Sequence, residues 1–224
     1  MRLRITFSKM AALRYTGHLD LHRLWERAAR RAGLPLSYSH GFHPLPRLQL
    51  ASALPLGCSG RAEILDLWLE DQPLSDRLAG SPEACRVLLQ SALPNGLTVT
   101  DAEQVDEKSP ALQTLVEAAE YEVTLLDPPA KDLEQKLANL MQSGSLPRVR
   151  RGRSYDLRPL IERLDLRAGD GSSDPVLEMT LANRESATGR ADEVLVELGI
   201  PLEATRIERK RLLFSEKPLK SAGR

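Results

Sequence analysis

The order in which strand-like and helix-like periodicities follow one another constrains the fold of this chain more than any other feature. In residues 1–107, apolar residues first alternate, then recur at helical spacing from Leu21 to Ala32, and then alternate again between proline and glycine turns. A second helix is expected up to Ala92, because Ser81 is a suitable N-cap and Pro82 suits the first helical position. The expected strands of this half cover residues 1–8, 36–39, 48–54, 64–69 and 97–105.

Residues 116–214 repeat this order of periodicities. Helices are expected over 132–141 and 191–198, and Gly199 suits the end of the second one. The expected strands cover residues 121–126, 149–157, 175–181 and 204–214, with a loop at 168–173. We therefore predict an α+β protein of two tandem ferredoxin-like (βαββαβ) halves, each an antiparallel sheet with helices on one face.

The predicted domains follow from this repeat. The first half covers residues 1–107 and carries every histidine, and the second covers residues 116–214. A linker is expected near 106–115, where charged residues and Ser109-Pro110 interrupt the apolar pattern. Residues 215–224 are predicted to be a flexible basic tail.

The net charge of zero hides an asymmetry along the chain. Residues 1–50 hold nine basic side chains against two acidic ones, a net charge of +7, whereas residues 51–107 hold three against ten, a net charge of −7. Two further basic clusters occur at 148–158 and 206–211. Arginine binds phosphate oxygens with two parallel hydrogen bonds and stays charged, so these clusters predict a phosphate-bearing partner, although solvated surface charge explains them equally well.

Composition excludes several other classes of protein. No apolar run approaches the roughly 20 residues that a bilayer-spanning helix needs, so no contact with a membrane is expected. The first residues lack the apolar core of a signal peptide, and we expect the protein in the cytoplasm. Cys58 and Cys85 form no Cys-x-x-Cys pattern and are predicted to be buried, unreactive thiols. The chain itself is therefore expected to hold no cofactor.

All four histidines lie in one short, arginine-rich stretch. Histidine titrates near neutral pH and serves as acid, base, metal ligand or phosphate partner, so this stretch is where chemistry is expected. His18 and His22 are four residues apart and would share one face of a helix. His40 and His43 flank Gly41-Phe42 in a turn that Pro44 and Pro46 stiffen.

The same stretch resembles a known family. Residues Tyr15-Thr16-Gly17-His18-Leu19-Asp20-Leu21-His22-Arg23 and the run Tyr38-Ser39-His40-Gly41-Phe42-His43-Pro44-Leu45-Pro46-Arg47 are similar to the uncharacterised radical SAM-associated proteins. The resemblance extends to Ala53-Leu54-Pro55-Leu56-Gly57, to Glu63 and Asp66, and more weakly to residues 190–195. It implies a free-standing accessory chain whose partner is a radical SAM protein.

This chain lacks the cysteine triad that holds a radical SAM cluster. The resemblance therefore implies that S-adenosylmethionine and an iron–sulfur cluster belong to the partner alone. Any radical chemistry would take place there.

We predict that the first strand, the first helix and the turn at 38–47 converge on one cationic pocket, with rings for stacking and arginines for phosphate. The candidate ligand-binding residues are His18, Asp20, His22, Arg23, Tyr38, Ser39, His40, Phe42, His43 and Arg47. In the alternative, structural interpretation, Phe42 is a core residue, Tyr38 lies on a strand face and the histidines brace the loop.

Several functions are compatible with this pattern. The favoured one is an accessory module that holds RNA, or another phosphate-bearing substrate, for the radical SAM partner. A metal-independent RNA-processing enzyme would use His18, His40 or His43 as general base, with Tyr38 or Ser39 assisting. A metal site held by the histidines and Asp20 is a third possibility, which the surrounding arginines disfavour. The last is a structural adaptor that docks on its partner through the basic face.

Overall fold

The computed structural model describes residues 1–70, 81–150, 152–169, 174–184 and 187–215. Within these residues, one nine-stranded, mostly antiparallel sheet runs through the whole molecule, and four helices of eight residues or more pack against it. The sheet order is β10-β9-β5-β11-β3-β1-β4, with β2 added to β3 and β8 added to β9. The predicted α+β class is confirmed as a mixed fold with a mostly antiparallel sheet.

The first half supplies one end of the sheet. Its elements are β1 (Arg2–Lys9), α1 (His18–Arg31), β2 (Leu48–Leu50), β3 (Ser59–Trp68), α2 (Pro82–Ala92) and β4 (Leu97–Val105), with a short 3-10 helix, η1 (Ala11–Tyr15), after β1. The strands lie in the order β4-β1-β3-β2, and every neighbouring pair is antiparallel.

The second half supplies the other end of the sheet. Its elements are α3 (Leu112–Leu115), β5 (Val116–Leu125), α4 (Leu133–Gln142), β6 (Pro147–Arg150), β7 (Arg153–Asp156), η2 (Arg158–Leu160), β8 (Ile161–Arg167), β9 (Val176–Arg184), β10 (Ala187–Thr188), α5 (Ala191–Leu198), η3 (Leu202–Ala204) and β11 (Thr205–Phe214). Its four long strands lie in the order β8-β9-β5-β11, again antiparallel.

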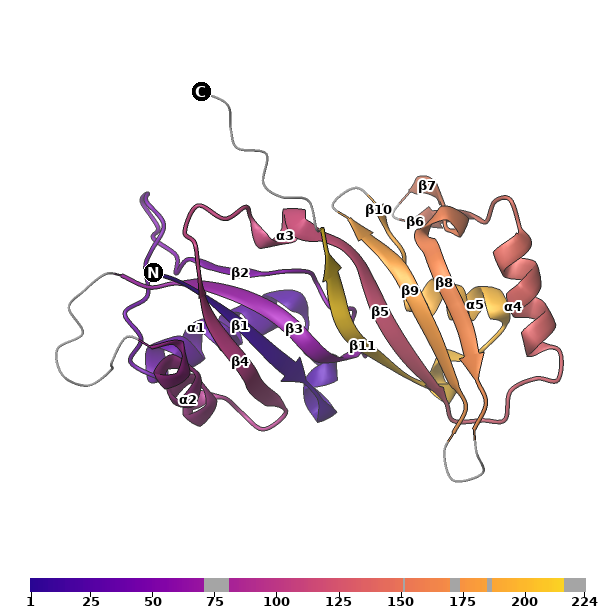
Figure 1. Cartoon of the computed structure of the whole chain (residues 1–224), viewed down its shortest axis with the longest axis horizontal. Coiled ribbons are helices and arrows are strands. Elements are labelled where there is room, and N and C mark those ends of the chain that lie inside the picture. Colours follow the sequence, from indigo (N-terminus) through magenta and orange to yellow (C-terminus); the bar gives the residue numbers. More distant parts are fainter. Residues whose placement is uncertain (71–80, 151, 170–173, 185–186, 216–224) are drawn as a thin grey trace.

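The two halves meet where β11 runs parallel to β3 (Figure 1). The pairing is short and involves Glu208 with Ser59 and Arg209 with Gly60. Farther along β3, β2 occupies the same edge, at Leu65 to Leu67. The same edge of β3 therefore pairs with β2 of its own half and with β11 of the other half.

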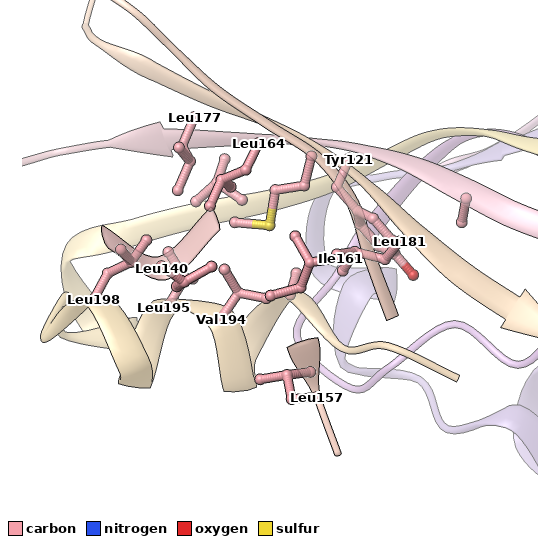
Figure 2. Packing of buried hydrophobic residues seen from close by; sticks show 14 of the residues in the cluster. Tyr121, Leu140, Leu157, Ile161, Leu164, Leu177, Leu181, Val194, Leu195 and Leu198 are labelled. Atoms are coloured by element: carbon pink, nitrogen blue, oxygen red, sulfur yellow. The ribbon is translucent and has the colours of Figure 1, made fainter. Parts of the chain in front are cut away.

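Each half has its own hydrophobic core. Leu3, Ile5 and Phe7 alternate on β1, and they pack against α1, where Trp25 meets the Phe7 ring edge-on at 4.8 Å between centroids. Figure 2 shows α5 under the sheet of the second half, with Val194 and Leu195 directed at the strands. Because the helices cover one face of the sheet, charged side chains such as Glu120 and Arg211 occupy the other.

Several predicted elements differ in the structure. Residues 36–39 form only isolated bridges, at Leu36 and Tyr38, instead of a strand. Residues 149–157, predicted as one strand, belong to the β6–β7 hairpin, which turns at Gly152 with a φ of 77° and forms a separate two-stranded sheet. The strand that pairs with β9 is β8, which the prediction missed. Residues 170–173 of the expected loop and 216–224 of the expected tail lie outside the described residues.

Candidate anion-binding pocket between the two halves

A buried ion pair joins the halves on the helix-covered side of the sheet. Arg209 of β11 is fully buried, Glu63 of β3 is 4% exposed, and the Arg209 Nε donates to Glu63 Oε1 at 2.8 Å. A second bond, from Nη2 to the other carboxylate oxygen, completes a bidentate pair. A Cβ at residue 60 would lie 2.6 Å from the Glu63 side chain, so only glycine fits at Gly60.

The remaining donors of Arg209 are also used. Nη1 donates to the carbonyl of Ala53 and Nη2 to that of Ser52, both at 3.2 Å, and the hydroxyl of Tyr121 completes the set. Burial alone would lower the pKa of Arg209, but Glu63 and Tyr121 outweigh it and raise that pKa. The Asn183 side chain donates to Ser52 Oγ at 2.9 Å, which adds a second polar link between the halves.

A pocket of about 420 Å³ opens beside this ion pair. Both halves line it: His18, Ser52 and Pro55 come from the first, Tyr121 and Asn183 from the second. Four arginines also line it, namely Arg150, Arg184, Arg190 and Arg209. The lining residues include no aspartate or glutamate, so positive charge faces the cavity without a carboxylate in its wall.

Two of these arginines are held by carboxylates behind the pocket wall. Arg190 Nε donates to Asp192 Oδ1 at 2.8 Å, and Arg184 Nη2 donates to Glu162 Oε1 at 2.9 Å. Such pairs fix the guanidinium groups without using all five of their N–H donors. The pocket therefore presents pre-positioned donors of the kind that bind phosphate oxygens.

His18 is the predicted site residue that the structure places in this pocket. It begins α1, and its Nδ1 is buried and has no hydrogen-bond partner among the described residues. Burial lowers the pKa of His18, and the nearby His22 lowers it further. The neutral form of His18 is therefore favoured, and its buried Nδ1 has no partner among the described residues.

The other predicted residues of α1 lie elsewhere. The His22 ring contacts the Leu48 carbonyl, with 3.3 Å between Nε2 and the oxygen, and its Nδ1 lies 3.2 Å from Glu26. Asp20 and Arg23 line a different pocket, of about 330 Å³, beside α1 and the end of α2. The structure thus separates His18 from the residues that share its helix.

The loop of residues 38–47, here called the signature loop, lies outside the pocket. It contributes no residue to the pocket that His18 lines, so the two do not converge as predicted. Phe42 is fully exposed and therefore not a core residue, and His40 and His43 are exposed as well.

The signature loop is a turn held by Ser39, whose Oγ accepts from the Leu45 amide at 3.1 Å. Tyr38 bridges to Pro46, and Arg47 stacks on Trp68 with 4.9 Å between the guanidinium carbon and the ring centroid.

None of the four arginines of the pocket was among the site residues predicted from the sequence. Arg150 and Arg209 fall in the two basic clusters, which carried the phosphate expectation without being assigned to the site. Arg184 and Arg190 stand apart in the sequence, and only the fold brings them to the same cavity. Cys58 and Cys85 are buried and unpaired, as predicted, and burial raises the pKa of Cys58 to about 11.

Two other expectations concern metals and membranes. Across the described ranges, no group of three or more histidine, cysteine, aspartate or glutamate side chains is arranged to hold a metal ion. No observation therefore supports the histidine-ligated metal site. In the same part of the chain, no helix combines the length and apolar character needed to cross a bilayer.

Comparison with protein families places the chain in one of them. Residues 2–191 match the model of an uncharacterised protein conserved in bacteria, DUF2344, and the chain belongs to this family. The expectation of an uncharacterised family is thereby confirmed. The description of the family does not mention radical SAM proteins, so that association stays a prediction. No curated protein matches the chain.

Among solved structures, a chain of the "Crystal Structure of a Cbf5-Nop10-Gar1 Complex" is similar to this one, with 13% sequence identity and a TM-score of 0.49. The match covers 96% of this chain and 50% of that chain, so this chain spans about half the length of its structural relative. At this level of similarity the likeness carries no argument about function.

Proposed function

We propose that this protein is an accessory binding module of the cytoplasm that holds RNA, or another phosphate-bearing substrate, in the pocket between its halves. The observation that carries the proposal is the wall of that pocket, which Arg150, Arg184, Arg190 and His18 line next to the buried Arg209, and which includes no carboxylate. Guanidinium groups fixed by their own ion pairs bind phosphate without first having to become ordered.

We further propose that the two halves are tandem ferredoxin-like units. The strand orders β4-β1-β3-β2 and β8-β9-β5-β11, each antiparallel with helices on one face, support this interpretation. The domain limits, 1–107 and 116–214, remain a prediction.

The sequence resemblance supports a radical SAM protein as the partner. That partner would bind S-adenosylmethionine and the iron–sulfur cluster, and this chain would bind the substrate. A crosslinking pull-down, read for both protein and RNA, tests this role. We expect a radical SAM protein and RNA to be recovered together; recovery of RNA without such a protein would contradict the accessory role.

The binding role is tested with variants of the pocket wall. Arg150→Ala and Arg184→Ala should each weaken binding of a fluorescein-labelled, mixed-sequence RNA hexamer. The plot of log affinity against log salt should become shallower by about 0.7 for each phosphate of the single strand that the variant no longer binds. Arg86→Ala is the matched control, because Arg86 is paired with Glu83 on α2 and does not line the pocket. Equal losses of affinity in all three variants would contradict the proposed site.

His18 supports a second candidate function, metal-independent RNA processing with a histidine general base. Its lowered pKa keeps the ring neutral, the form in which a histidine accepts a proton, and its side chain lines the pocket. His40 and His43 lack such a setting, because they lie on the exposed signature loop. If this function is correct, purified protein cleaves RNA in the presence of a chelator and His18→Gln abolishes cleavage while binding persists. RNA left intact by the wild-type protein would rule the candidate out.

A further inference from the structure

A second pocket, of about 500 Å³, adjoins the first and differs from it in character. The two share Pro55 and Arg190 in their walls. Its wall combines an aromatic ring, aliphatic side chains, two carboxylates and three arginines: Tyr15, Leu56, Leu126, Leu202, Asp192, Glu203, Arg14, Arg190 and Arg206. Both walls therefore carry arginines, and the second adds an exposed ring and aliphatic side chains that suit a flat, partly apolar group.

Tyr15 is the feature of this pocket that suits a ring. It is 61% exposed although its surroundings are ordered by several contacts. The Arg14 guanidinium lies over the Tyr15 ring, 4.8 Å from its centroid, and Arg14 Nη2 donates to the Tyr15 hydroxyl at 2.8 Å. The carbonyl of Arg14 accepts from the Gly57 amide at 2.9 Å, which ties the segment to the loop that lines both pockets. An exposed aromatic ring held in this way is a platform for stacking.

The remaining wall offers apolar contacts and hydrogen-bond acceptors that the edges of a nucleobase can use. Leu56 and Leu202 are exposed, at 68% and 42%, and offer apolar contact. Glu203 and Asp192 are acceptors for the amino groups of a base, and they offset part of the charge of the three arginines in the same wall. Arg190, paired with Asp192, stands in the wall that the two pockets share.

We infer that the two pockets are subsites for one nucleotide unit, with its base against Tyr15 in the second pocket and its phosphate at the arginines of the first. This inference rests on the proposed function and deepens it: among phosphate-bearing ligands, it selects nucleotides. A free nucleotide and a nucleotide within RNA share this chemistry.

Binding of three probes to the full chain tests the inference: the RNA hexamer, an abasic hexamer with the same phosphates and no bases, and adenosine monophosphate. The wild-type protein should bind the RNA hexamer about tenfold more tightly than the abasic one, because stacking of one base contributes that much. Tyr15→Ala should remove this difference and leave affinity for the abasic hexamer unchanged. Tyr15→Phe should restore it.

Tyr38→Ala is the matched control, because Tyr38 is also an exposed tyrosine but lies on the signature loop. It should bind all three probes as the wild-type protein does. A loss of affinity for adenosine monophosphate in Tyr15→Ala equal to the loss for RNA identifies free nucleotides as a source of the ligand. A loss for RNA alone identifies the polymer.

Failure of the inference is distinguishable from failure of the proposed function. If Tyr15→Ala binds RNA as tightly as the wild-type protein while Arg184→Ala does not, the base subsite is wrong and the phosphate site stands. If the wild-type protein binds neither hexamer, the proposed function and the inference both fall.

Discussion

Glu63 and Asp66 stand three residues apart on β3 and are both buried against arginine, yet they serve different parts of the molecule. Because side chains alternate along a strand, the two carboxylates lie on opposite faces of the sheet. Glu63 faces the helices and binds Arg209 of the other half. Asp66 faces away from them and binds Arg2, with 2.8 Å between Arg2 Nε and Asp66 Oδ2.

Asp66, Arg2 and Arg4 form a cluster, here called the Asp66 cluster, that does not line the pocket. Arg2 also donates to the carbonyls of Ser109 and Pro110, at 2.6 and 2.9 Å, so it holds the segment between the halves. Arg4 donates to the second oxygen of Asp66, and the Arg2 guanidinium lies over Trp68. In contrast, Arg209 also lines the pocket. The same pair of residue types is structural on one face and lies next to a cavity on the other.

The largest expected effect comes from neutralising these carboxylates. Glu63→Gln and Asp66→Asn should each lower the free energy of unfolding by about 3–5 kcal/mol, because each leaves a buried guanidinium without its counter-charge. Chemical denaturation measures this decrease. Glu120→Gln is the control: its pair with Arg211 is exposed and should contribute less than about 1 kcal/mol.

Repeating the denaturation experiment with an added ligand distinguishes the two faces of the sheet. Inorganic pyrophosphate, added at constant ionic strength, should stabilise Glu63→Gln more than Asp66→Asn, because Arg209, left without its counter-charge, borders the pocket, whereas Arg2 and Arg4 do not. If pyrophosphate stabilised both variants equally, the two faces would not differ in function.

The local parts of this fold could be predicted from sequence. β4 begins and ends where predicted, because Pro94-Asn95-Gly96 marks the turn before it. α5 also has the predicted limits, because Gly199 adopts a φ of 70° at its end, where a side chain would be strained. Turn and cap chemistry act within a few residues, and such signals are visible in a single sequence.

The long-range parts could not be predicted in this way. β8 was missed because a bulge between Ile161 and Arg163 interrupts its alternation, and the neighbouring hairpin has the more strand-like pattern. The pair of Glu63 and Arg209 joins residues 146 positions apart, and nothing local to either residue marks it as buried. The histidine cluster led to His18, but the exposure of the signature loop follows only from the tertiary structure.

A smaller effect is expected at the Glu63 face from Tyr121→Phe. The change removes the hydroxyl that bonds to Arg209 and keeps the buried ring. We expect a decrease of about 1.5 kcal/mol in the free energy of unfolding, the usual size for a hydrogen bond to a charged group. Arg209 keeps its other partners, so the decrease should stay well below that of Glu63→Gln. A thermal or denaturant melt with a decrease as large as for Glu63→Gln would show that the hydroxyl, and not the carboxylate, holds Arg209.

On the Asp66 face, Arg47→Ala tests whether the signature loop contributes to binding. Arg47 is exposed and stacks on Trp68, so its removal should cost about 0.5–1 kcal/mol of stability. Affinity for the RNA hexamer should not change, because Arg47 lies outside the pocket. A decrease in affinity larger than that of Arg150→Ala would move the binding site to the signature loop.

The smallest effect is the pH dependence that His18 gives to the Glu63 face. Its pKa is lowered in the folded protein, first by burial and then by His22, from the ordinary value of 6.5. At a pH between the folded and unfolded pKa values, the unfolded chain binds more protons than the folded protein. The free energy of unfolding is therefore unaffected by His18 above about pH 6.5 and decreases as the pH falls below that value. Denaturation at pH 7 and pH 5 should therefore show a smaller decrease for His18→Gln than for the wild-type protein. His43→Gln, on the exposed signature loop, should keep the wild-type decrease; if it flattened the profile as much as His18→Gln, the pH dependence would not arise at the pocket.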